Sequence, residues 1–341
     1  MKNKSNIWTN IKYKKYGKQM GSLFIPYSSN RYASGNISIP ICVISNGNGL
    51  QLLLTAGNHG DEFEGQIVLS KLINKINHHN IKGSIILIPT LNSPACMEGK
   101  RLSPIDNLNL NRVFPGLSNG TPTQQIAYYI YNILLPKVDI IFDIHSGGDT
   151  LAFIPYCSGI IRGDKAKDKL TMDILKHFGA KYSLIKPFDK NDLGTERAAI
   201  DNDIIRIGGE FGGSGQVTTD TLGLLEYGIM RILKYLGILK TKKKLDKFYY
   251  DTDFIEYNKN KNQLYSDEYG VFEPFYNLGE KIKKYDVAGQ IHYLDNLNKK
   301  MKKILFKEKG ILIAKKNKPL VEPGDILFKT AKRIKWKKLI T

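Results

Sequence analysis

The chain has 341 residues, 42% of them hydrophobic, and a formal net charge of +19 at pH 7. This length suits one large domain or two, with a substantial buried core. No apolar run approaches the roughly 20 residues that a membrane helix requires, and no apolar segment follows the basic residues 1–18, as it would in a signal peptide. The three cysteines (Cys42, Cys96 and Cys157) are far apart and odd in number, which argues against a disulfide framework. The composition therefore predicts a cytoplasmic protein without a membrane partner.

The strong positive charge is compatible with nucleic-acid binding, but the kind of basic residue argues against that function. Only eight of the 51 basic residues are arginine, and the chain is also rich in asparagine and isoleucine. Lysine, asparagine and isoleucine are the residues that an A+T-rich genome encodes by default. The lysines are spread along the chain, with small clusters at 240–247 and 299–303 that are typical of solvated surfaces or linkers. We therefore expect no nucleic-acid partner.

From about Ile39 onwards, short β-rich runs alternate with segments of helical periodicity. The β-rich runs are residues 52–55, 84–89, 138–144, 151–155 and 203–211. The helical segments are residues 62–76, 122–135, 165–178 and 218–236. Several β-rich runs are almost entirely apolar, such as Ile85-Ile86-Leu87-Ile88, as expected of strands covered on both faces. The pattern predicts an α/β domain over residues 1–240, with a mixed, largely parallel sheet flanked by helices.

The pattern of apolar and polar residues changes after Leu236. Residues 240–247 form a basic stretch without apolar periodicity, which is typical of a linker. Beyond it lie short β-like segments with glycine-containing turns, such as NLGEKI and VAGQIHYLDN, and few helical patterns. Residues 248–341 are therefore predicted to form a small all-β, barrel-like C-terminal domain.

Two metal-ligating side chains follow the apolar run 52–55, in the stretch TAGNHGDEFEG. A polar turn built on glycine and asparagine would explain this stretch without any chemistry. However, His59 lies just after the predicted strand and Glu62 opens the next helix, and sites in open α/β sheets form at the carboxyl ends of strands. A third ligand candidate, His145, directly follows the apolar run 140–144 in DIIFDIHSGGDT. Three protein ligands with one position left for water are typical of a catalytic zinc site.

A hydrolytic zinc site also needs a carboxylate that does not bind the metal and can move a proton. Glu210, in IIRIGGEFGGSG, ends another predicted strand and has two glycines on each side, which allow close approach of a substrate. The loop RLSPIDNLNLNRVFPG contains Arg101 and Arg112, and arginine is suited to bidentate binding of a carboxylate. A polar surface loop is the alternative interpretation of that stretch.

The segments GNHGDEFEG, NLNRVFPG, DIHSGG and GGEFGG resemble, in this order, the core motifs of the succinylglutamate desuccinylase/aspartoacylase family. That family belongs to the zinc-carboxypeptidase superfamily, and the resemblance covers nearly the whole chain. It implies an α/β zinc-hydrolase domain followed by a small β-barrel-like domain. Within the family, PIDNLNLNRVFPG and SGNISIPICVISNGNG are most similar to the branch of N-acetyl-diaminobutyrate deacetylases of ectoine degradation.

The resemblance also implies a role for each candidate residue. One Zn²⁺ would be held by His59, Glu62 and His145, and Glu210 would be the general acid/base. The substrate carboxylate would be bound by Asn111 and Arg112, the oxyanion would be stabilised by Arg101, and Arg197 would be a further substrate-binding residue.

One position departs from many relatives, and another differs in its spacing. Asn109 stands where many relatives have an aspartate that accepts a hydrogen bond from a zinc-bound histidine, so the histidine should be a slightly weaker electron donor here. The deacetylase branch resembled here shares this substitution. The spacing from Arg197 to Glu210 also differs from that in relatives.

The leading hypothesis is a zinc-dependent amidohydrolase that removes an acyl group, most simply acetyl, from a small N-acylated amino acid. One alternative is a metallocarboxypeptidase, which the expected C-terminal domain disfavours because in the enzymes that the chain resembles this domain narrows the cleft to small substrates. The other is a desuccinylase or aspartoacylase acting on another N-acyl amino acid. A cationic substrate side chain would require an acidic partner, for which Asp149 and Asp192 are candidates. The sequence is compatible with a homo-oligomer but does not define one.

Overall fold

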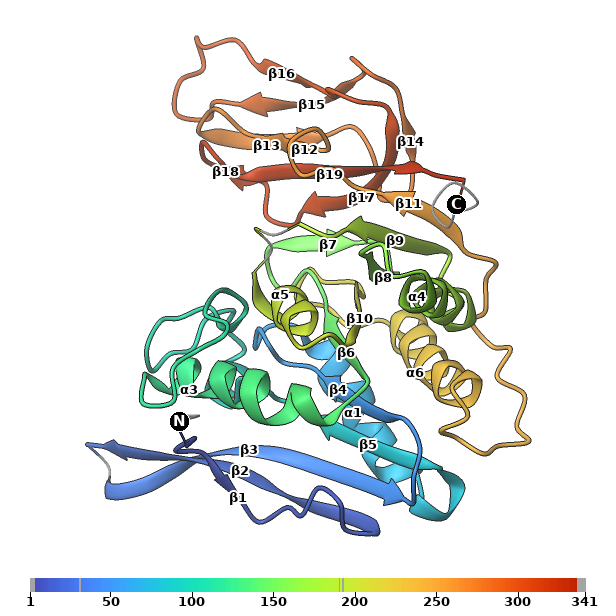
Figure 1. The fold of residues 1–341 in the computed structure, drawn as a ribbon. Coiled ribbons are helices and arrows are strands. Elements are labelled where there is room, and N and C mark those ends of the chain that lie inside the picture. The colour runs from blue at the N-terminus through green and yellow to red at the C-terminus, as the bar shows by residue number, and fades with distance from the viewer. Residues whose placement is uncertain (1–3, 31, 190, 192, 336–341) are drawn as a thin grey trace.

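One long mixed sheet runs through most of the molecule (Figure 1). The computed structural model describes residues 4–30, 32–189, 191 and 193–335. Within them, the strand order of this sheet is β1-β2-β3-β5-β4-β6-β10-β8-β9-β11-β19-β17-β14, with β12 beside β19 and β7 beside β17. The predicted α/β fold with a mixed sheet is confirmed, but the expectation of a largely parallel sheet is wrong: among the described strands, antiparallel pairs outnumber parallel ones, because an N-terminal hairpin and the C-terminal region add antiparallel strands at the two ends.

The centre of the sheet consists of parallel strands whose carboxyl ends lie together. These strands are β5 (Gly83–Ile88), β4 (Gln51–Thr55), β6 (Ile140–His145) and β10 (Ile205–Glu210). Thr55 is in register with Asp143, and Glu210 is in register with His145. This alignment places the last residues of three neighbouring strands at one edge of the sheet.

Helices cover both faces of the central strands, which explains why those strands are apolar throughout. In Figure 1 α4 (Lys165–Phe178) and α6 (Thr219–Tyr235) lie on one side, whereas α3 (Pro122–Tyr129) and α5 (Gly194–Asp201) lie on the other. The helices α4 and α6, together with α1 (Phe63–Lys75), pack on one face of the central strands, which includes Leu52 and Leu54. The alternate residues, Leu53 and Ile141 among them, pack against the second side. Burial on both faces is what a hydrophobic core with two helical layers requires.

Several elements were not anticipated from the sequence. The largest is the hairpin of β2 (Gly17–Ser29) and β3 (Tyr32–Asn46), which forms the end of the sheet farthest from the C-terminal region together with β1 (Trp8–Thr9). The other additions are short: α2 (Ser93–Glu98), β8 (Tyr156–Ile161), β9 (Tyr182–Pro187) and α5. The predicted helix 122–135 begins as α3 and continues as a π-helical turn, Ile130–Leu134, and a 3₁₀ turn, Leu135–Lys137. A 3₁₀ turn, His78–Asn80, and another, Leu110–Arg112, lie in loops.

The C-terminal region consists of β-strands, as predicted, and these strands pair antiparallel with one another. Its strands are β11 (Asp253–Glu256), β12 (Gln263–Tyr265), β13 (Gly270–Pro274), β14 (Lys281–Ile282), β15 (Val287–His292), β16 (Lys302–Leu305), β17 (Gly310–Lys316), β18 (Leu320–Val321) and β19 (Ile326–Arg333). A four-stranded sheet, β16-β15-β13-β18, packs on the strands around β19 through a core that includes Phe272, Phe306 and Phe328.

This region is joined to the main sheet by hydrogen-bonded strands. β11 pairs in parallel with β9, and β17 pairs antiparallel with β7 (Leu151–Phe153). Phe254 of β11 also belongs to the core beneath α4 and α6. Strand pairing and core packing thus cross the predicted boundary, and the division into two domains at residues 240–247 stays a prediction. None of the helices in the described residues is long and apolar enough to cross a membrane.

Candidate active site

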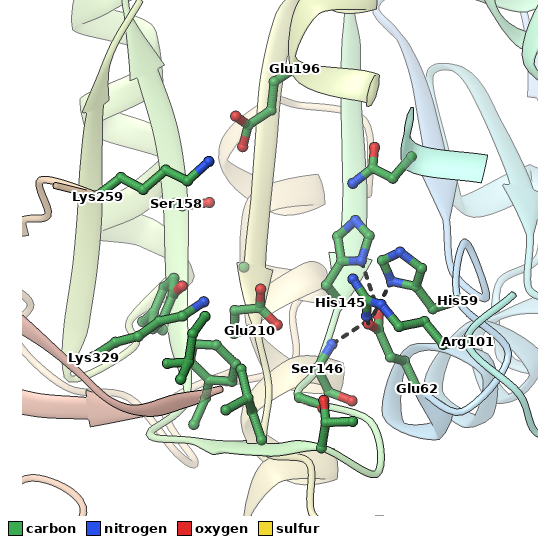
Figure 2. Close-up of a pocket in the computed structure, with 18 of the residues that line it drawn as sticks. His59, Glu62, Arg101, His145, Ser146, Ser158, Glu196, Glu210, Lys259 and Lys329 are labelled. Carbon is green, nitrogen blue, oxygen red and sulfur yellow. Dashed lines mark hydrogen bonds and ion pairs between the residues drawn. The ribbon is translucent and has the colours of Figure 1, made fainter. Parts of the chain in front are cut away.

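A cavity of about 440 Å³ lies at the carboxyl edge of the central strands (Figure 2). Its walls include the ends of β6 and β10, the loop after β4, the loop 101–112 and part of the C-terminal region. Seven of the eight predicted site residues line it: His59, Glu62, Arg101, Asn111, Arg112, His145 and Glu210. The structure thus brings together residues that are up to 151 positions apart, counted from His59 to Glu210.

His59, Glu62 and His145 form a buried group with metal-ligand geometry. One donor atom from each lies within 4.8 Å of the others. The Nδ1 atoms of His59 and His145 lie 2.7 and 2.9 Å from the two Glu62 carboxylate oxygens. Two imidazole nitrogens and a carboxylate within this distance of one another suit a zinc ion. The residues present therefore fit the expected metal.

The outer nitrogen of each histidine is held by a different acceptor. Nε2 of His59 lies 3.2 Å from Oδ1 of Asn109, and Nε2 of His145 lies 2.8 Å from Oδ2 of Asp143. These contacts fix both rings with Nδ1 facing the metal position, as outer partners of ligand histidines do. Sequence reasoning identified Asn109 but missed Asp143. The signal was present, because residues two apart on a strand share a face and Asp143 precedes His145 by two.

The ionisation of Glu62 is set by its two histidine neighbours. Burial by itself favours the neutral acid, but His59 and His145 outweigh it and lower the pKa of Glu62 to about 2. Glu62 is therefore an anion over the physiological range, which is the form that coordinates a cation.

Glu210 is the carboxyl group in the cavity with the opposite behaviour. It is the last residue of β10, and its Oε2 is buried without a hydrogen-bond partner among the described residues. Burial and the charge of Glu62 raise the pKa of Glu210 to about 7, although His145 and Lys329 oppose the shift. Two carboxyl groups at one site thus have well-separated pKa values, a pattern typical of acid–base catalysis.

The loop 101–112 places three polar groups along the cavity. Arg101 Nη1 lies 3.5 Å from Oε1 of Glu62, so its guanidinium is next to the metal position. Asn111 Oδ1 accepts a hydrogen bond from the Thr195 N–H at 3.1 Å, which leaves its amide nitrogen as the group able to donate to a ligand. Arg112 is exposed, with Nη1 donating to the carbonyl oxygen of Asn111 at 2.9 Å.

Arg197 is the predicted residue that does not line the cavity. It lies on α5, where its Nε is 2.7 Å from Oδ1 of Asp201, one turn farther along the helix. Its neighbour Glu196 lines the cavity instead, since consecutive helical residues point about 100° apart. Glu196 is paired with Lys186 at 2.5 Å and with Arg206 at 3.2 Å.

Three lysines that sequence reasoning missed also line the cavity: Lys186, Lys259 and Lys329. Lys259 and Lys329 belong to the C-terminal region, and Figure 2 shows both on the side of the cavity opposite His59 and Glu62, with Lys329 pointing toward Glu210 and Lys259 beside Ser158. Burial lowers the pKa of Lys329 and the charge of Glu210 partly offsets it. Of the two acidic candidates, Asp149 is exposed and is not among the residues that line the cavity, and Asp192 lies outside the described residues.

The fold and this arrangement of residues define a class of enzyme. The succinylglutamate desuccinylase/aspartoacylase catalytic domain matches residues 48–236, more than half of the chain. The chain belongs to this family of amide hydrolases. The resemblance noted in the sequence is therefore confirmed.

Individual relatives match over nearly their whole length. The N-alpha-acetyl-L-2,4-diaminobutyric acid deacetylase of Halomonas elongata is 31% identical over 326 residues, covering 95% of this chain and 94% of the relative. The product-bound ectoine utilization protein EutE (DoeB) of Ruegeria pomeroyi is 32% identical, with a TM-score of 0.90 over 97% of this chain and 100% of that one. A succinylglutamate desuccinylase of Silicibacter sp. TM1040 is 30% identical, with a TM-score of 0.91 over the same shares.

Proposed function

We propose that this chain is a zinc-dependent deacetylase of a small N-acetylated amino acid. The observation that carries the proposal is the buried His59–Glu62–His145 group beside Glu210, in one cavity with the arginines of loop 101–112. The ligands provide a metal site, and Glu210 provides a carboxyl group with a pKa of about 7. This combination serves the hydrolysis of an unactivated amide.

We assign each of the chain's own groups a role that its position supports. Glu210 in its carboxylate form accepts a proton from the attacking water and then delivers it to the nitrogen of the leaving amine. Arg101, next to the metal position, stabilises the carbonyl oxygen as negative charge develops on it. A zinc ion at His59, Glu62 and His145 would supply Lewis acidity and lower the pKa of a bound water.

Asn111 and Arg112 are the proposed binding groups for the α-carboxylate of the substrate. The amide nitrogen of Asn111, for which the described residues provide no partner, supplies one donor, because the Thr195 N–H already occupies its oxygen. The guanidinium of Arg112 supplies two parallel donors that match a carboxylate. N-acetyl-diaminobutyrate is the first substrate to test, since two relatives at 31% and 32% identity are a deacetylase of this compound and an ectoine utilization protein.

A specific feature of the cavity favours a second candidate, an N-acyl amino acid with an additional carboxylate. Among the described residues, six lysine or arginine side chains and three acidic side chains line the cavity. Of the acids, Glu62 faces the metal position, Glu196 is paired with two cations, and Glu210 has the acid–base role. In the described part of the cavity, no acidic residue is therefore left to pair with a cationic substrate side chain. Lys259 and Lys329 would instead suit a substrate with an anionic side chain.

Metal content and substrate choice test the proposal in two steps. The purified protein should retain about one zinc per chain, and His59→Ala or His145→Ala should lose the metal and the activity together. Full metal occupancy in either variant would refute the ligand assignment. The zinc-loaded enzyme is then assayed with N-acetyl-diaminobutyrate, N-acetylaspartate, N-succinylglutamate and a blocked dipeptide. Preference for the first supports the deacetylase, preference for the second or third supports the second candidate, and preference for the peptide indicates a carboxypeptidase.

A further inference from the structure

Thr195, at the start of α5, is hydrogen-bonded both to the residues around the metal position and to the loop that carries the proposed substrate-binding residues. It is fully buried, and its hydroxyl donates to Oδ2 of Asp143 at 2.6 Å. The same oxygen accepts from Nε2 of His145. The backbone N–H of Thr195 donates to Oδ1 of Asn111 at 3.1 Å. We infer that Thr195 is a positioning residue that couples the metal-binding histidine to the substrate-binding asparagine.

The metal side of this connection depends on the Asp143 carboxylate. Asp143 is completely buried, and its two oxygens have separate partners: Thr55 Oγ1 donates to Oδ1 at 2.8 Å, and Thr195 Oγ1 and His145 share Oδ2. The Thr195 hydroxyl therefore fixes the oxygen that sets the orientation of the His145 ring. Without it, His145 is the remaining partner of Oδ2, so the direction of the ring toward the metal position is less firmly fixed.

The substrate side depends on the first turn of the helix. The first N–H groups of a helix have no partner inside it, so the Thr195 N–H is free to hold the Asn111 side chain. The preceding residue, Gly194, has φ of +71°, and a Cβ there would overlap Oδ1 of Asn111. The chain approaches Asn111 this closely only because residue 194 is glycine. The first turn of α5 thus makes two hydrogen bonds through Thr195, one to Asp143 and one to Asn111.

The inference rests on the proposed metal site, and zinc affinity tests it without turnover. Zinc dissociation constants are measured by chelator competition for the wild type, Thr195→Val and Thr195→Ser. Valine keeps the shape and removes the hydroxyl that holds Asp143, so we expect about tenfold weaker zinc binding, the low end of the effect of losing a direct outer partner of a ligand histidine. Serine restores the hydroxyl and should restore most of the affinity.

Thr330→Val is the matched control for a buried threonine. Its hydroxyl accepts a hydrogen bond from Asn262 at 3.1 Å in the C-terminal region, away from the metal ligands. This variant should bind zinc as the wild type does, even if its melting temperature falls. Wild-type zinc affinity in a folded Thr195→Val protein would overturn the inference, whereas a wild type that binds no zinc would overturn the proposed function instead.

Gly194→Ala tests the coupling from the substrate side. The new Cβ displaces the turn from Asn111, so KM and the zinc dissociation constant should rise together. Gly237→Ala is the matched control, because Gly237 also has a positive φ, +68°, but a Cβ there meets nothing within 4 Å. It should lower stability without changing either quantity. A rise in KM alone in Gly194→Ala would show that the metal position and the substrate-binding loop are independent and would overturn the coupling.

Discussion

Glu210 is the residue on which the proposed chemistry depends most directly, and Gln is the substitution that isolates its charge. Glu210→Gln preserves the shape of the side chain but cannot carry a proton. We expect full zinc content and a loss of at least about 100-fold in kcat. Near-normal turnover with full zinc would remove Glu210 from the acid–base role.

The raised pKa of Glu210 also predicts the pH dependence of the enzyme. The base must be ionised, and Glu210 becomes protonated as the pH falls below about 7. The value of kcat/KM should therefore fall toward acid pH, about tenfold per unit on the steep limb. Bound zinc would stabilise the carboxylate, so the midpoint should lie at or below 7. The control is the residual activity of Glu210→Gln, which should lack this limb.

Arg112 tests carboxylate recognition. Arg112→Lys keeps the charge but loses the planar pair of donors, so we expect retained zinc, a higher KM and a loss in kcat/KM of about 2–4 kcal/mol. The matched measurement uses a substrate amide that lacks the carboxylate. This amide should be poor for the wild type and hardly worse for the variant. An equally steep loss with the amide would assign Arg112 a structural role.

Single residues show why part of the site was predictable from the sequence. His59, Glu62, His145 and Glu210 follow apolar strands, and the ends of neighbouring parallel strands meet in space. Thr195 gave no such signal, since its role depends on which loop the start of α5 touches.

At the scale of elements, α5 is the most informative segment. It brings Thr195 and Glu196 to the site, while Arg197 lies on a more exposed face of the same helix. Sequence periodicity did not reveal this helix, because eight residues give only two turns. The hairpin β2–β3 was missed for a different reason: its residues alternate between the buried side, such as Leu23 and Ile39, and exposed positions, which lowers its mean hydropathy.

Arg197 provides the prediction at this scale. Because it pairs with Asp201 along the surface of α5, Arg197→Ala should cost less than about 1 kcal/mol in stability. We expect KM for the preferred substrate to stay within about twofold of the wild-type value, set against the large effect of Arg112→Lys. A KM increase as large as that of Arg112→Lys would contradict this prediction and would show that Arg197 binds the substrate.

At the scale of the whole molecule, the C-terminal region completes the cavity with residues remote from the metal ligands in sequence. Lys329 lies on β19, and no motif or periodicity in that strand points to metal ligands more than 180 residues earlier in the chain. Such contributions depend on how the two parts of the chain pack, which sequence patterns do not encode.

Lys329→Met tests this contribution. Methionine fills a similar volume without the charge, so a substrate with an acidic side chain should lose about one charge-assisted hydrogen bond, or about tenfold or more in kcat/KM. N-acetyl-diaminobutyrate should lose less, because its cationic side chain gains nothing from a lysine. Equal losses with both substrates would mean that Lys329 acts only through packing or through Glu210.

The strand pairing across the predicted boundary has a consequence for how the protein denatures. β9 is hydrogen-bonded to β11, and β7 to β17, so a chain cut near residue 240 would leave two strands of the catalytic part with unpaired edges. Unpaired edges of this kind favour association between chains. We therefore expect residues 1–240 alone to aggregate. The intact protein should melt in one calorimetric transition, in which the C-terminal strands that carry Lys329 unfold and zinc is released at the same temperature.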